Sequence, residues 1–233
     1  MCGRYFLAKL AEELERLYGV TRWVDVDPRW NIAPMQDAPV LVPVDDGRLE
    51  CASMRWGLVP GWAKEETIGN RMINARSETA HEKPAFREAL QRRRCAIPAD
   101  GFYEWQVRAR TKRPYLITPR EGAMAFAGLW EEWDRGDGVL RTFTILTTAA
   151  NERLREYHER MPVMLRRDAI GRWMDASLDG REALGFALGE GAVGDLDVHR
   201  VSTLVNSPKN DVPEVMARVE EDVLEAGEQG ELF

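Results

Sequence analysis

The pattern of apolar and polar positions predicts many short strands and a few short helices. Residues 7–18 carry four leucines at helical spacing, and Gly19 follows as a helix stop. Alternating or β-branched runs predict strands at 39–44, 49–56, 95–98, 101–105, 114–118, 124–130, 143–148 and 198–202. Further short helices are predicted at 83–93, 151–157, 170–173 and 180–188. So many short strands are typical of a curled sheet, and we predict an α+β fold on a β-barrel-like antiparallel core with peripheral short helices.

Length and charge suggest one domain with an acidic tail. The 233 residues are 44% hydrophobic and 30% charged, which is ordinary for a globular protein. Residues 55–120 hold 14 Lys/Arg against 7 Asp/Glu, whereas residues 214–233 hold 1 against 7. We therefore predict a domain over 1–213 and an acidic helix or tail over 214–233, frayed after about residue 224. The basic middle fits a polyanion partner, but solvated helix faces explain it equally well.

Several classes of protein are excluded by what the sequence lacks. It has no signal-type or membrane-spanning apolar run, so we expect a cytoplasmic protein without membrane contact. Its three cysteines are far apart and form neither a disulfide framework nor a zinc motif, and Cys51 and Cys95 fit small core positions. No phosphate-binding or dinucleotide motif occurs, and we expect neither a metal nor another cofactor.

Cys2 is the first candidate for chemistry. Removal of Met1, which is normal before a small residue, would give the chain an N-terminal 1,2-aminothiol. An α-amine has a pKa near 7.7–8.0, so about a tenth of it is unprotonated at neutral pH. Such an amine condenses with an aldehyde to an imine, and the thiol then closes a thiazolidine ring. The alternative is that Cys2 belongs to a frayed terminus.

Other candidates lie in polar or aromatic settings. Asn74 and Arg76 belong to the unusually polar stretch 70–80, which fits a binding segment or a polar loop. Glu104 lies within GFYEW, where burial would raise the carboxyl pKa as a general acid requires, although strand alternation could also expose it. His158 precedes a Met-Pro break and is either a catalytic or a surface histidine. His81 and His199 have no such setting.

The two tryptophans of RWGLVPGWA allow two interpretations. Trp56 and Trp62 lie in a loop that we expect to be rigid, because it holds two glycines and a proline. They are either core anchors or a wall against which a base stacks.

Seven blocks of the sequence, in order, resemble one known family. They are MCGRY, RWGLVPGWA, NARSET, CAIPADGFYEW, FAGLW, HERMPVML and VNSPKND. Together they resemble the SOS-response-associated peptidase (SRAP) family, which includes the abasic-site shields, over about residues 1–213. Trp30 and Met35 depart from the residues common in the family's YNxAP-like stretch.

The resemblance implies a function and a role for each candidate. It implies a sensor and shield of abasic sites in single-stranded DNA, with Cys2 forming a covalent thiazolidine cross-link. Asn74 then positions the terminus and the opened sugar, Glu104 promotes sugar ring opening, and His158 assists imine formation and reversal. The implied phosphate-binding residues are Arg4, Arg76 and Arg160.

Three functions stay open at this stage. The first is covalent capture of abasic DNA by a monomer that becomes nucleoid-associated on DNA, with a lyase side reaction through the imine. The second is a cysteine peptidase using Cys2 and His158, which could also release Met1 autocatalytically. The third is a non-covalent single-stranded DNA-binding module that uses the basic middle and the tryptophans.

Overall fold

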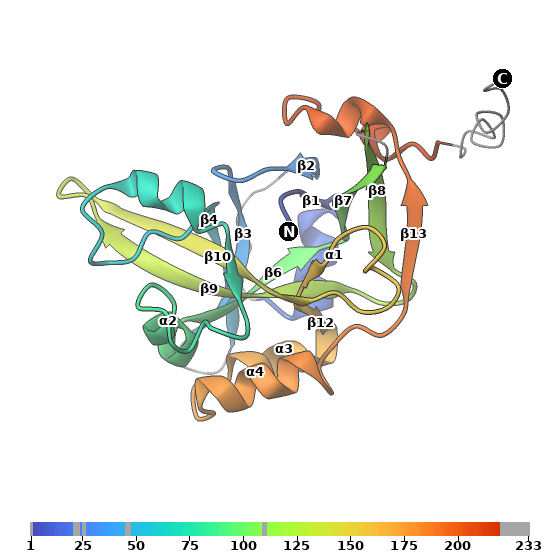
Figure 1. The fold of residues 1–233 in the computed structure, drawn as a ribbon. Coiled ribbons are helices and arrows are strands. Elements are labelled where there is room, and N and C mark those ends of the chain that lie inside the picture. The colour runs from blue at the N-terminus through green and yellow to red at the C-terminus, as the bar shows by residue number, and fades with distance from the viewer. Residues whose placement is uncertain (1, 21–23, 25–26, 45–47, 109–110, 220–233) are drawn as a thin grey trace, which may run out of the picture.

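A closed five-stranded barrel forms the centre of the computed structural model, which describes residues 2–20, 24, 27–44, 48–108 and 111–219. Its strands run in the order β10-β4-β3-β6-β9, and β9 pairs with β10 to close the ring (Figure 1). Only the β10–β4 pairing in this ring is parallel. The barrel strands are β3 (Asp37–Pro43), β4 (Leu49–Trp56), β6 (Arg94–Ala99), β9 (Met124–Asp134) and β10 (Val139–Ala149).

A second sheet packs beside the barrel and carries the start of the chain. Its order is β13-β8-β7-β1-β2, and all of its pairings are antiparallel. The described N-terminal residues lie between this sheet and the barrel (Figure 1). The strands are β1 (Tyr5–Leu7), β2 (Arg29–Ile32), β7 (Gly101–Arg108), β8 (Thr111–Pro119) and β13 (Leu196–Arg200). The expected α+β fold with a barrel core is confirmed.

A sharp turn joins the two sheets. Only Asp100 separates β6 in the barrel from β7 in the second sheet. The carboxylate of Asp100 accepts the backbone N–H groups of Ala8 and Lys9, at 2.8 and 3.2 Å, so it fixes the chain after β1 against this turn. A Cβ at Gly101 would lie 2.5 Å from the carbonyl oxygen of Ile117, and glycine is therefore required for the close approach of β7 and β8.

The barrel opens on one side, and another segment fills the gap. Beyond Ile145, β10 no longer pairs with β9, and the chain over 160–166 lies between them. Val163 donates to the carbonyl of Leu146 and accepts from the N–H of Ala127, both at 2.8 Å. The small strands around this gap are β5 (Asn74–Arg76), β11 (Arg160–Pro162) and β12 (Met164–Arg166). Three predicted site residues, Asn74, Arg76 and Arg160, therefore belong to strands bound to β10.

The helices are short and peripheral, as predicted, but two expectations about them were wrong. The first helix begins at Ala11, because residues 5–7 pair with β2 and β7, and Leu10 is 63% exposed. Residues 151–157 form turns rather than a helix. The α-helices are α1 (Ala11–Tyr18), α2 (Arg87–Arg92), α3 (Ile170–Met174) and α4 (Gly180–Leu188), and the 3-10 helices are Glu66–Arg71, Arg167–Ala169, Thr203–Asn206 and Pro213–Met216. No helix within the described part of the chain is long and apolar enough to cross a membrane.

The core settles the alternative that the sequence left open for Trp56 and confirms the expected burial of two cysteines. Trp56 is fully buried, donates its ring N–H to the carbonyl of Ile73 at 2.8 Å and lies edge-on to Tyr5. Cys51 and Cys95 are both buried, as predicted. Residues 45–47, between the strands predicted at 39–44 and 49–56, lie outside the described residues, but the two strands pair antiparallel. The acidic segment is described only as far as residue 219, and within it Val215 is buried.

Candidate functional site

Cys2 is held in a buried position between β5 and β7. The N–H of Tyr103 donates to the carbonyl of Arg4 at 3.0 Å, so the contact between β1 and β7 extends to Arg4, two residues after Cys2. The side-chain amide of Asn74 donates to the carbonyl oxygen of Cys2 at 2.8 Å. Cys2 has no exposed surface, which rules out the frayed terminus that the sequence left open.

The Cys2 thiol lies in an environment that keeps it protonated. Burial raises the thiol pKa far above its usual range, and the nearby carboxylate of Glu104 raises it further. Such a group is protonated before the reaction and gives up its proton as it forms the new bond, rather than reacting as a preformed thiolate.

Glu104 is buried on β7 and close to both Cys2 and His158. It is 5% exposed, so its carboxyl group is largely removed from solvent. Burial raises the pKa of its carboxyl group, and the proximity of His158 partly opposes this rise. The carboxyl group therefore holds a proton at higher pH than an exposed glutamate does, as a general acid requires.

His158 is oriented by a backbone hydrogen bond. Its Nδ1 accepts the N–H of Arg160 at 2.9 Å, so the neutral ring carries its proton on Nε2. The segment before β11 brings His158 to Glu104, although the two residues are far apart in sequence. The structure therefore gathers all four predicted catalytic residues, Cys2, Asn74, Glu104 and His158.

The three predicted DNA-binding arginines differ in what they contact. Arg4 donates from Nη1 to Asn31 Oδ1 at 2.8 Å and to the carbonyl of Val205 at 2.7 Å, and its guanidinium lies 5.8 Å from the ring centre of Trp105. Burial lowers its pKa. Arg4 therefore ties the N-terminal strand to the segment 205–211.

Arg160 is paired with a carboxylate of the NARSET block. Its two terminal nitrogens bind the two oxygens of Glu78 at 2.6 and 2.9 Å, and Nη2 also donates to the carbonyl of Thr147 at 2.6 Å. The hydrogen bonds from Arg160 lower the pKa of Glu78. Two parallel bonds of this kind have the geometry with which arginine holds a phosphate.

Arg76 is exposed, and within the described ranges it makes no ion pair. It lines a cavity of about 390 Å³ together with the catalytic candidate Asn74. The remaining lining residues are mostly apolar or cationic, namely Trp62, Met72, Thr79, Lys83, Pro84, Ala85 and Phe86.

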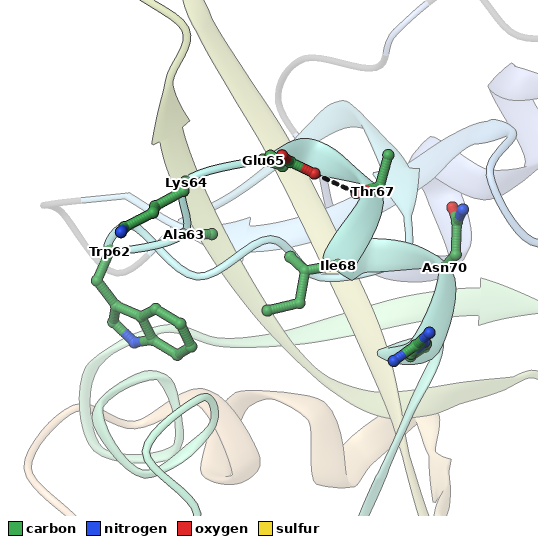
Figure 2. A pocket seen from close by; sticks show the side chains of 8 residues that line it. Trp62, Ala63, Lys64, Glu65, Thr67, Ile68 and Asn70 are labelled. Carbon is green, nitrogen blue, oxygen red and sulfur yellow. Dashed lines mark hydrogen bonds between the residues drawn. The ribbon is translucent and has the colours of Figure 1, made fainter.

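Trp62 is the exposed tryptophan of the RWGLVPGWA loop. Its side chain is 62% exposed, in contrast to the buried Trp56. It borders the cavity beside Asn74 and also a second cavity of about 700 Å³, where Figure 2 shows the side chain of Ile68 pointing towards its ring. An exposed ring beside a cationic cavity provides a surface on which a base can stack.

Sequence reasoning missed the residues that hold the last block in place. Asn31 is fully buried, and its amide donates to the carbonyls of Val205, Ser207 and Asn210. Asp211 accepts the N–H groups of Trp30 and Asn31 at 2.6 and 2.9 Å. The polar residues of WNIAP and VNSPKND were the available signal, but nothing in the sequence indicates that the two stretches contact each other.

No metal-binding group emerges from the described part of the chain, where no cluster of three or more His, Cys, Asp or Glu side chains has suitable geometry.

Comparison with known proteins identifies the family. The model of the SOS response associated peptidase (SRAP) family matches residues 1–208. This chain belongs to the SRAP family. The abasic site processing protein YoaM of Bacillus subtilis is 40% identical to this SRAP protein over 223 residues, which cover 93% of this chain and 97% of the relative.

More distant SRAP relatives agree in sequence and in fold. The abasic site processing protein HMCES of Gallus gallus is 34% identical over 227 residues, covering 83% of this chain and 67% of the relative. A crystal structure of a Bacteroides thetaiotaomicron protein superposes with a TM-score of 0.80 at 28% identity and covers 94% of this chain and 100% of the other.

Proposed function

We propose that this SRAP protein recognises abasic sites in single-stranded DNA and captures them covalently through Cys2. The observation that carries the proposal is the convergence of Asn74, Glu104 and His158 on the N-terminal cysteine. Relatives that share 40% and 34% of the aligned residues are named abasic site processing proteins. These names agree with the chemistry that the aminothiol suggests.

The reaction requires that Met1 be removed. While Met1 is attached, the nitrogen of Cys2 is an amide and has no basic lone pair. After removal, the amine adds to the aldehyde carbon of the ring-opened sugar, and loss of one water gives an imine. The thiol then adds across the C=N bond: a bond forms between Sγ and the sugar carbon, and the thiol proton passes to the nitrogen. The product has the mass of protein plus DNA minus one water.

The surrounding residues have distinct roles in this proposal. Glu104 in its protonated form donates to the ring oxygen of the sugar, which opens the ring to the aldehyde. His158 transfers protons during dehydration of the amine adduct and during reversal of the cross-link. Asn74 holds the carbonyl of Cys2 and thereby orients the amine. Elimination from the imine would give the lyase side reaction.

Strand binding is assigned to exposed cationic and aromatic groups. Arg76 and Trp62 flank the cavity beside Asn74, where a phosphate and a base next to the abasic site fit. Arg160 would bind a phosphate if Glu78 released it, and Arg4 would act mainly by fixing the N-terminal strand.

The buried thiol argues against a general cysteine peptidase. Such an enzyme requires a reactive thiolate, whereas burial here raises the pKa of the Cys2 thiol. Autocatalytic release of Met1 stays a prediction.

Intact mass spectrometry tests the proposal directly. The purified protein is measured alone and after incubation with an abasic single-stranded oligonucleotide. We expect a chain lacking Met1 and a new species at protein plus oligonucleotide minus one water, stable without borohydride. Cys2→Ser is the matched control, because it keeps the amine and should give an adduct only after borohydride reduction.

Two results would contradict covalent capture. Retention of Met1 together with undiminished cross-linking would exclude the amine mechanism. Equal affinity for intact and abasic strands, without any adduct, would favour the non-covalent binding module.

A further inference from the structure

Gln106 is a buried polar residue on the same strand as Glu104, two positions further along β7. Residues two apart on a strand face the same side of the sheet. Both side chains are 5% exposed. Tyr115 of β8 lies directly opposite Glu104 in the antiparallel register, so its side chain is on that same face.

These residues contact the segment that carries His158. The amide nitrogen of Gln106 donates to the carbonyl of Glu156 at 3.1 Å, and its oxygen accepts the hydroxyl of Tyr115 at 3.4 Å. The ring of Tyr115 packs against Tyr157, with ring centres 4.6 Å apart. Figure 1 shows this segment, between β10 and β11, crossing β7 and β8.

The segment needs such an anchor because it lacks regular structure. Residues 151–157 form turns, so few backbone hydrogen bonds fix their distance from β7. Both contacts act on the two residues immediately before His158. The backbone bond from Arg160 sets the ring of His158 from the other side.

We infer that Gln106, supported by Tyr115, is a positioning residue that holds His158 in working distance of Glu104. The inference rests on the proposed function, in which this pair moves protons during capture of the abasic aldehyde. Gln106 itself does not touch the reacting atoms and acts through the Glu156 carbonyl.

A double-mutant cycle separates this role from a structural one. Single-turnover cross-linking to an abasic oligonucleotide is measured for the parent, Gln106→Leu, His158→Ala and the double variant. We expect Gln106→Leu to slow cross-linking about tenfold in the parent background. General acid–base catalysis typically raises a rate by about 10²–10⁴-fold, and a displaced His158 would lose part of that enhancement. In the His158→Ala background, the same change should alter the rate less than about twofold.

Gln106→Glu provides an independent test through pH. Its carboxylate cannot donate to the Glu156 carbonyl, but its protonated form can. The rate relative to the parent should therefore be low at pH 8 and rise towards pH 5. Gln91→Leu is the matched control, because Gln91 joins α2 to the start of α4 by similar bonds away from the site, and its cross-linking rate should be unchanged.

The outcomes are distinct. A tenfold loss in both His158 backgrounds, or no loss in the parent background, would overturn the positioning role of Gln106 while leaving covalent capture intact. Thermal melting and binding to intact single-stranded DNA identify a variant that is merely misfolded. If Gln106→Leu is misfolded, the pH dependence of the Gln106→Glu rate tests the positioning role instead. A parent protein that forms no cross-link would instead refute the proposed function.

Discussion

The side chain of Asn74 is bonded to the backbone of Cys2, 72 positions earlier in the chain, by an N–H···O contact of 2.8 Å. This contact depends on the parallel pairing of β5 with β10, which places Asn74 opposite Ile145 at the edge of the barrel. The other polar atom of the amide, Oδ1, is buried and has no hydrogen-bond partner among the described residues. An acceptor of this kind is suited to a substrate hydroxyl or to the amine that forms after Met1 is removed.

Asn74→Ala should slow covalent capture about tenfold or more, because the terminus loses its orienting bond. The free energy of unfolding should fall by only about 1 kcal/mol, which is typical of one hydrogen bond. Single-turnover cross-linking and chemical denaturation measure the two effects. Asn70→Ala, on the exposed 3-10 helix, is the control and should change neither (Figure 2). Equal rates for the two variants would remove Asn74 from the mechanism.

Glu104→Gln should make the proposed covalent capture slower and the fold more stable at neutral pH. Burial raises the pKa of Glu104, so the folded state binds its proton more tightly than the unfolded state does. The stability associated with this proton is complete below the unfolded pKa, near 4.3, and is lost as the pH rises through the higher folded pKa. Glutamine has no such loss, and it should slow capture by about 10²-fold or more.

Thermal melts between pH 4 and pH 8 test the sign of this effect. The melting temperature of Glu104→Gln relative to the parent should increase with pH over this range. A difference that stays constant, or that decreases towards pH 8, would mean that the ionised carboxylate is well solvated or paired in the folded protein.

The local sequence was sufficient for the eight predicted strands, which correspond to β3, β4, β6 to β10 and β13, and for the burial of Cys51 and Cys95, because both follow from hydrophobic patterning. The short strands β1, β2, β5, β11 and β12 were not predicted. It was insufficient where tertiary contacts override local preference. Residues 151–157 have helical composition, but their backbone is drawn into turns by contacts with β7 and by the pairing that begins at Arg160. The helix predicted over residues 7–18 begins only at Ala11, because the pairing of β1 with β2 and β7 leaves no local signal in the sequence.

The candidate site was predictable in its members but not in its geometry. Glu104 and His158 have nothing in their sequence neighbourhoods that indicates their proximity, which arises from the gap between β9 and β10. The tether from Asn31 to the carbonyls of residues 205–210 could not be predicted either, because backbone acceptors are present in every sequence. The resemblance named the residues, and the structure supplied their contacts.

Glu78→Gln should strengthen binding to intact single-stranded DNA by about threefold at low salt, because Arg160 loses the carboxylate that neutralises it. Arg160 lowers the pKa of Glu78, so their ion pair persists at neutral pH and is lost as the pH falls through that lowered pKa. Fluorescence anisotropy at pH 7 measures the change. Weaker binding would show that Glu78 instead orients Arg160 towards a phosphate.

Arg76→Ala should weaken binding to intact and abasic strands by the same factor, because a phosphate contact carries no base information. The slope of log affinity against log salt should fall by about 0.7, as expected for one phosphate of a single strand. Arg181→Ala on α4 is the control, since that exposed arginine lies away from Cys2. A loss confined to abasic strands would place Arg76 at the reacting sugar instead.

Replacement of the two tryptophans of one loop should separate binding from folding. Trp62→Ala should cost about 1–3 kcal/mol of single-strand affinity through lost stacking and leave the melting temperature nearly unchanged, because the ring is 62% exposed. Trp56→Ala should lower the free energy of unfolding by about 3–5 kcal/mol, because it empties a fully buried site beside Tyr5 and Phe143. Anisotropy and urea denaturation of both variants test the contrast. If Trp62→Ala binds like the parent, the cavity beside Asn74 does not hold a base.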